Sequence, residues 1–288
     1  MKYILLLLAM AIASVSSVTT VSADSKSFNF YVGNKNGGGS ATMQTMISEA
    51  LLERGWNINF KVIGNCGQVK NLMETGNEPV LAGWGPDWNS DPANKCYIKP
   101  TSTNFVDTYS VNPRFLCGTA DTPDFAWQAG KTYKIGVNAG QFHGPAMQEA
   151  ADKLGVKFTV IEYKNSGAIK KAMAGKEIDV WFTNAGYPNH VAGTQKCFYS
   201  TLTTDILDIK PLSTLISNER AFATYTGFLL INDKFSTADK KQLITDVQTV
   251  VDSKDYREKI GTRGVLMDDL SIEDQLTRIE KASKAHKK

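Results

Sequence analysis

The chain has 288 residues and a formal net charge of +3, a basic excess too slight to indicate nucleic-acid binding. Its length is sufficient for one large domain or for two lobes that each have a hydrophobic core. After the N-terminal segment, no run approaches the roughly 18 apolar residues that a membrane-spanning helix needs.

The first 23 residues have the features of a secretory signal peptide. Lys2 gives the positive start, 4–13 the apolar core, and Val21-Ser22-Ala23 the small residues at a cleavage site. No cysteine follows the cleavage site, which argues against a lipid anchor. We therefore expect a soluble protein exported to the periplasm, with a mature chain that begins near Asp24.

A glycine run follows the first predicted strand, 28–32, whose residues are aromatic and β-branched. After the run comes a helix that ends at Gly55 and whose apolar stripe consists of Met43, Met46, Ile47, Ala50 and Leu51. Gly37-Gly38-Gly39-Ser40 thus joins a strand to a helix start, where backbone N–H groups and the helix dipole can bind an anion. No Lys-Ser/Thr pair follows the glycines, so this is not a nucleotide-binding P-loop.

The next predicted elements are a strand, a helix and a strand, and then a loop-rich stretch, 84–113, precedes a short strand at 114–117. The β-α-β-α-β order predicts a parallel sheet with covering helices. The three elements before the loop-rich stretch are 58–63, 67–75 and 79–83.

The same order then returns in the second half of the chain. A second glycine segment, 138–145, again lies between a strand and a helix, and the helix-ending glycines occur at similar offsets: Gly55 and Gly155, Gly76 and Gly175. The predicted elements are strands 133–137, 157–162, 178–182 and 221–232, and helices 147–154, 166–174, 238–251, 255–261 and 271–285.

We therefore expect an α/β protein with two similarly built lobes, each presenting a glycine-containing helix N-terminus to a ligand between them. Ligands of open α/β sheets bind beyond the carboxyl ends of the strands, where these loops lie. The first lobe is predicted to comprise 24–120 and 221–288, and the second 121–220.

Several segments resemble the periplasmic solute-binding receptors of tripartite tricarboxylate transporters, also called Bug receptors. The similarity extends in order and spacing over nearly the whole mature chain. The similarity includes the two glycine segments. In addition, 162–166 resembles the family's Pro-Tyr-Lys-Gly strand end, and 179–184 resembles its Asp-Val-Met-Phe-Asp segment. The segments 255–264 and 271–274 resemble its C-terminal helix pattern.

This resemblance implies a type II periplasmic-binding-protein fold that binds a small carboxylate through backbone amides and water, without a cofactor. It also implies a monomer that is not an enzyme and that passes its ligand to integral membrane permease subunits. The residues expected to contact the ligand are Asn36, Gly38, Gly39, Ser40, Trp84, Phe142, His143, Gly144, Tyr163 and Asn184.

Some of these residues also have a purely structural interpretation. Ser40 is a favourable helix N-cap, and His143 has the features of an exposed loop tip. Trp84 and Phe142 could wall the pocket, although aromatic side chains more often pack in a core.

Four cysteines, Cys66, Cys96, Cys117 and Cys197, remain after signal removal. In an oxidising compartment an even number indicates two disulfides, with three pairings open. Zinc binding is less favoured, because no two cysteines have close ligand spacing. A hydrolase in which Cys66 and His143 act as a thiol pair is the alternative function. A scaffold or adhesin without a ligand is a third class, which the paired glycine loops disfavour.

Overall fold

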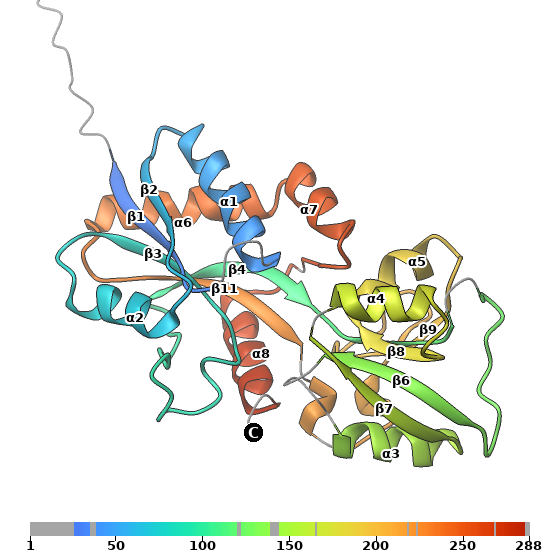
Figure 1. Ribbon diagram of the computed structural model, residues 1–288. Coiled ribbons are helices and arrows are strands. Elements are labelled where there is room, and N and C mark those ends of the chain that lie inside the picture. The colour runs from blue at the N-terminus through green and yellow to red at the C-terminus, as the bar shows by residue number, and fades with distance from the viewer. Residues whose placement is uncertain are drawn as a thin grey trace, which may run out of the picture.

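The computed structural model describes residues 26–34, 39–119, 122–138, 144–164, 166–217, 219–222, 224–267 and 269–285. The predicted signal peptide and four of the predicted ligand-binding residues lie outside these ranges: Asn36, Gly38, Phe142 and His143. Within the described residues, the chain forms two sheets that lie side by side, each with helices on its faces (Figure 1). The predicted α/β fold class is confirmed.

The first sheet has five strands in the order β2-β1-β3-β11-β4. Its three N-terminal strands are parallel, as the β-α-β-α-β pattern predicts, whereas β11 runs antiparallel to both of its neighbours. The strands are β1 (Ser27–Val32), β2 (Asn57–Val62), β3 (Val80–Trp84), β4 (Phe105–Asn112) and β11 (Tyr225–Ile231).

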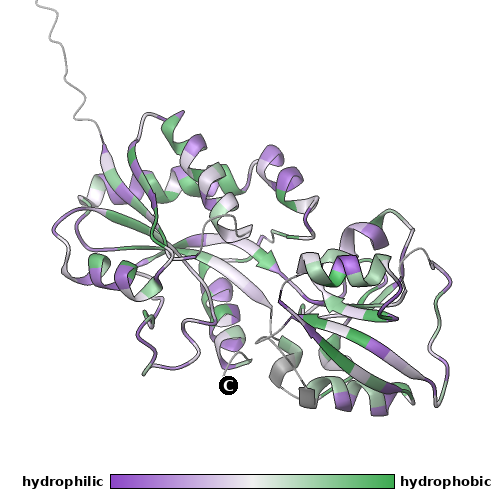
Figure 2. Ribbon diagram, viewed as in Figure 1, coloured by the Kyte–Doolittle hydropathy of each residue, from purple (hydrophilic) through white to green (hydrophobic). Residues whose placement is uncertain are grey.

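Helices cover both faces of this sheet because successive side chains of a strand point to opposite sides. Leu81 of β3 belongs to the core with α1 and α6, whereas its neighbours Val80 and Ala82 belong to the core with α2 and α8. Figure 2 shows the hydrophobic strands between these helix layers. The helices are α1 (Gly39–Leu52), α2 (Cys66–Thr75), α6 (Thr237–Val251), α7 (Lys254–Gly261) and α8 (Ile272–Ala285).

The second sheet has six strands in the order β10-β9-β5-β8-β6-β7. Strands β6, β7 and β8 are parallel, and β5 is antiparallel to β8 and β9. Helices α3 (Gly144–Leu154), α4 (Ser166–Ala174) and α5 (Tyr187–Val191) accompany it. The strands are β5 (Phe115–Cys117), β6 (Thr132–Asn138), β7 (Lys157–Tyr163), β8 (Val180–Thr183), β9 (Cys197–Ser200) and β10 (Lys210–Pro211).

The chain passes between the sheets twice, from β4 to β5 and from the short helix η3 (Glu219–Phe222) to β11. The predicted strand at 221–232 begins later than expected, at Tyr225, because η3 occupies its first residues. The predicted strand at 114–117 is observed as β5, and its hydrogen bonds place it in the second sheet, before residue 120. The lobe boundaries at 120 and 221 remain predictions.

Polar contacts hold the two passages together. The backbone N–H of Arg114 donates to Thr201 Oγ1 at 2.9 Å, and this hydroxyl lies 2.8 Å from Thr224 Oγ1. These hydrogen bonds tie the passage from β4 to β5 to the passage from η3 to β11. The antiparallel bridge between Val111 and Leu266 joins β4 to the segment between α7 and α8, and it lies within the first lobe.

Candidate functional site

The carboxyl end of β1 leads to α1, whose first two residues are Gly39 and Ser40. A Cβ placed on Gly39 would have no neighbour within 4 Å, so packing does not require a glycine here. The first N–H groups of a helix lack acceptors within the helix and carry a partial positive charge. This helix end is therefore suited to an anion.

One turn further along α1, Gln44 connects the helix to β4. Its side chain is completely buried, and Nε2 donates a hydrogen bond of 2.9 Å to the hydroxyl of Tyr109. A Cβ on Gly83 would lie 2.1 Å from the Gln44 amide, so the glycine of β3 makes room for it. Burial raises the pKa of Tyr109 to about 12, against the opposing effect of hydrogen bonds from Ser40 and Gln44.

Asp87 and Tyr225 converge on the backbone of Gly85, just after β3. A Cβ on Gly85 would lie 2.5 Å from the Tyr225 hydroxyl and 2.8 Å from Asp87 Oδ1. Burial raises the pKa of Asp87 to about 6, although hydrogen bonds from the backbone of Asp87 and Trp88 lower it. Burial and the charge of Asp87 together raise the pKa of Tyr225 well above its ordinary value, so this phenol is neutral at pH 7.

A buried arginine lies close to this polar cluster. Arg114 is 8% exposed, and burial lowers its pKa to about 10, an effect that the nearby Tyr225 opposes. The guanidinium thus remains charged at neutral pH. Arg114 lies in the short link between β4 and β5 and is not among the residues expected to contact the ligand.

The second sheet presents a row of polar side chains at the same ends of its strands. Asn138 closes β6, Ser166 begins α4 and Thr183 closes β8. Asn138 Nδ2 donates to Ser166 Oγ at 3.3 Å, and Thr183 Oγ1 donates to the same oxygen at 3.1 Å. Gly144, predicted to contact the ligand, is the first residue of α3. Both sheets thus present a helix start and hydroxyl or amide groups at their carboxyl ends.

Asn184 and Tyr163 lie beside this row. Asn184 follows β8, and its Nδ2 donates to the backbone carbonyl of Arg263 at 3.1 Å, in the segment that joins α7 to α8. Tyr163 is half-buried at the end of β7, where its ring edge would lie 3.4 Å from a Cβ on Gly136. Ligand contact by either residue remains a prediction.

Trp84 occupies a core position at the end of β3. It is completely buried, its ring meets that of Trp88 at 5.0 Å between centroids, and its indole N–H donates to Asn89 Oδ1 at 3.1 Å. The core-packing interpretation therefore accounts for these contacts. A ligand contact by Trp84 stays a prediction.

The cysteines form two disulfides, Cys66–Cys96 and Cys117–Cys197, and all four are oxidised. This confirms the expectation of two bridges and selects one of the three possible pairings. The hydrolase alternative was wrong, because it required a free thiol at Cys66.

Sequence reasoning missed most members of the buried cluster. Asp87 had a usable signal, since it follows a predicted strand in Trp-Gly-Pro-Asp-Trp. The neighbouring Asn34 lies three residues before Gly37 of the glycine segment. Tyr109 and Tyr225 had none, because they come from antiparallel strands far apart in the sequence that pair only in the folded sheet.

Comparison with solved structures places this architecture among known folds. A TctC solute-binding protein from Polaromonas aligns with a TM-score of 0.62 and 15% identity, over 92% of this chain and 98% of that one. MatC from Rhodopseudomonas palustris with bound malate aligns with a TM-score of 0.56 and 13% identity, over 91% and 98%. This chain has the fold of the two-lobed periplasmic binding proteins.

A third structure, an R. palustris protein with adipate, aligns with a TM-score of 0.57 and 17% identity, over 91% of this chain and 95% of that one. No protein-family model and no curated protein matches the sequence. Among the residues that the structure describes, no helix is long and apolar enough to cross a membrane.

Proposed function

We propose that this protein is an extracytoplasmic solute-binding protein that captures a small carboxylate between its two lobes. The observation that carries the proposal is a polar cluster beside the start of α1, made of the buried Gln44 and Tyr109 and the half-buried Asp87 and Tyr225. Such a cluster at the carboxyl ends of the strands is typical of a ligand site in an α/β sheet. The fold similarity to proteins solved with malate and adipate supports a carboxylate as the ligand.

The anionic end of the ligand is expected to lie between the starts of α1 and α3, within reach of Arg114. Each helix end contributes about 0.3–1 kcal/mol when exposed and up to about 2 kcal/mol when partly buried. Hydrogen bonds to a charged acceptor contribute about 1.5–3 kcal/mol each. Together with Gly39, Ser40 and Gly144, the arginine accounts for binding in the micromolar range, near −8 kcal/mol.

The partner is proposed to be the membrane permease of a tripartite tricarboxylate-type transporter, which would receive the ligand in the periplasm. Support comes from the predicted signal peptide and from the fold shared with a TctC solute-binding protein. In this role the protein binds its ligand as a monomer, needs no cofactor and is not an enzyme.

A thermal-shift screen of the mature protein tests the proposal. The screen should contain mono-, di- and tricarboxylates, with sugars and neutral amides as contrasts. A ligand at about one hundred times its Kd adds about 2.7 kcal/mol to the free energy of unfolding, which raises the Tm by several degrees. Stabilisation by a sugar or an amide and by no carboxylate would contradict the proposal.

The role of Arg114 is tested by calorimetry with the best carboxylate of that screen. Arg114→Met removes the charge and keeps a flexible apolar side chain, and we expect affinity to fall about 10- to 150-fold. Arg263→Met is the matched control, because it removes an arginine whose described hydrogen bonds use only its backbone N–H and carbonyl. Equal, small losses in both variants would exclude Arg114 from the site.

A further inference from the structure

Apart from hydroxyl groups, among them that of Tyr225, three side-chain oxygens in the described part of the first lobe are buried without a hydrogen-bond partner. They are Asn34 Oδ1, Gln44 Oε1 and Asp87 Oδ1. We call them the acceptor cluster. Gln44 is completely buried, so bulk solvent does not hydrate its amide oxygen. A native protein rarely leaves buried acceptors without a donor, and several such atoms together point to a missing group that brings donors.

These oxygens lie close together around the same two tyrosines. Gln44 bonds to the hydroxyl of Tyr109, and Asn34 acts on the pKa of Tyr225 as a hydrogen-bond neighbour. Asp87 Oδ1 and the Tyr225 hydroxyl both approach Gly85, where a Cβ would lie 2.8 Å and 2.5 Å from them. The acceptor cluster is therefore a local feature at the end of β3 and the start of α1.

Asp87 is the decisive member of the cluster. An amide can turn over and present its NH₂ group instead of its oxygen, but an ionised carboxylate offers acceptors only. With a pKa of about 6, Asp87 is mostly ionised at neutral pH. A partly buried anion with an unpaired oxygen favours a cationic donor over a neutral one.

The charges around Tyr225 have opposite signs. Arg114 and Asp87 each interact electrostatically with the Tyr225 phenol. A positively charged and a negatively charged side chain therefore lie near the same residue. A ligand with a negative and a positive group can pair with both. A plain carboxylate would be attracted by the charge of Arg114 and repelled by that of Asp87.

We propose that the ligand is a small carboxylate that also carries an ammonium group, and that the acceptor cluster binds the ammonium. An ammonium group has three N–H donors for the three oxygens, whereas a hydroxyl group has one. This inference rests on the proposed function, because it presupposes that the same site binds the carboxylate. It assigns Asp87 as the residue that distinguishes amino acids from other acids.

Matched ligands test the inference on the wild-type protein. Calorimetry should compare aspartate, malate and succinate, and then alanine, lactate and propionate, since each series differs only in an ammonium, a hydroxyl or a hydrogen. We expect the amino acid to bind at least tenfold more tightly than both other members in the series whose length fits the site. Equal or tighter binding of the hydroxy or unsubstituted acid would overturn the ammonium assignment and leave the carboxylate-binding function intact.

A variant pair locates the discrimination at Asp87. Asp87→Asn keeps the size and one oxygen acceptor but removes the charge, and we expect it to abolish the preference for the amino acid. Asp91→Asn is the control on the same loop, where the exposed carboxylate accepts a hydrogen bond of 2.9 Å from the Ala93 N–H. A preference that persists in Asp87→Asn, with cooperative unfolding that shows a folded variant, would refute the role of Asp87. Failure of every carboxylate to bind would instead reject the proposed function, and the inference with it.

Discussion

Asn184 of the second lobe donates a hydrogen bond of 3.1 Å to the backbone carbonyl of Arg263, which lies in the first lobe's link between α7 and α8. The next residue, Gly264, approaches the same asparagine from the other side, because a Cβ there would lie 2.3 Å from the Asn184 carbonyl oxygen. Leu266 then forms the bridge to Val111. The link between α7 and α8 is therefore a third contact between the lobes, although the chain does not cross there.

Gly264→Ala should destabilise the protein by more than about 1 kcal/mol. Gly264 has φ +69°, a conformation unfavourable for alanine, and the added methyl would collide with the Asn184 backbone. Urea unfolding measures the loss. Gly261→Ala is the matched control, since that glycine lacks a positive φ and its Cβ would meet no atom within 4 Å. Equal stability of the two variants would show that the Asn184 contact does not restrict this segment.

Gly39→Asp should weaken carboxylate binding at least tenfold and leave the unliganded Tm unchanged or slightly raised. The new carboxylate occupies open space at the start of α1, where a negative charge interacts favourably with the helix dipole. The same charge repels the carboxylate of a ligand. Gly39→Ala, which adds only the methyl, is the control and should bind nearly normally. If calorimetry gives Gly39→Asp the wild-type affinity, the start of α1 does not contact the ligand.

Asp87 should make wild-type stability fall as the pH rises from about 4 to about 6. Its pKa is raised from 3.8 to about 6, so over this range the folded protein binds a proton that the unfolded chain has released. The raised pKa of Asp87 lowers the free energy of unfolding by at most about 3 kcal/mol at neutral pH. Urea unfolding of Asp87→Asn should therefore show a gain relative to wild type at pH 7.5 that disappears near pH 4. A difference that is the same at both pH values would contradict the raised pKa of this carboxylate.

The two disulfides should contribute unequally to stability. Cys117–Cys197 closes 80 residues of sequence and Cys66–Cys96 closes 30. The loop-entropy model gives the longer loop about 0.9 kcal/mol more stabilisation. Paired Cys→Ala variants of each bridge, compared by urea unfolding, measure this difference. Thiol titration of the unfolded wild type without reductant should detect no free cysteine, and a larger loss for the 30-residue bridge would mean that packing, rather than chain entropy, dominates.

Local signals predicted the helices well because helix ends are determined by nearby residues. Gly55 and Gly155 were expected to end helices, and both adopt positive φ values of 85° and 68° just after α1 and α3. The predicted helix 166–174 coincides with α4, and 67–75 differs from α2 by one residue. Apolar periodicity and a terminal glycine are sufficient for such elements.

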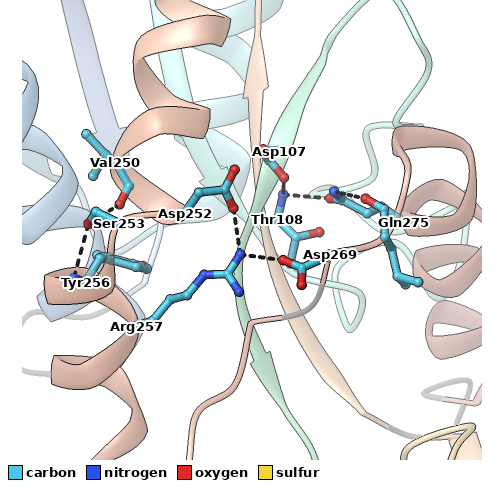
Figure 3. Close-up of polar contacts among 10 residues, drawn as sticks. Asp107, Thr108, Val250, Asp252, Ser253, Tyr256, Arg257, Asp269 and Gln275 are labelled. Carbon is cyan, nitrogen blue, oxygen red and sulfur yellow. Dashed lines mark hydrogen bonds and ion pairs between the residues drawn. The ribbon is translucent and has the colours of Figure 1, made fainter.

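Strand β4 was missed because its stability depends on distant residues. It lies within a stretch expected to be loop, and it contains Asp107, a buried charged residue in the middle of a strand. Figure 3 shows how Gln275 of α8 meets this strand, where its Oε1 accepts from the Thr108 N–H at 3.0 Å. Burial raises the pKa of Asp107, whereas Gln275 and the charge of Arg278 lower it. The residues around Asp107 in the sequence do not indicate that Gln275 and Arg278 will lie next to it in the fold.

The site was predicted in outline and missed in detail for the same reason. The glycine segment and helix start at Gly39 were visible because they are contiguous in the sequence. Tyr109, Arg114 and Tyr225 come together only when β11 inserts beside β4, after the whole second sheet has been traversed. Their chemistry therefore depends on topology rather than on a motif.

This topology determines which lobe can form first as the chain emerges during synthesis or export. All strands of the second sheet lie in one uninterrupted stretch, from β5 to β10, so that sheet can assemble as soon as it is available. The first sheet is complete only after β11 has been synthesised. The contact of Gln275 with β4, next to Asp107, forms later still, because Gln275 lies near the C-terminus. The first-lobe site is therefore completed last, and a chain truncated before α8 would leave a charged strand for chaperones or proteases to recognise.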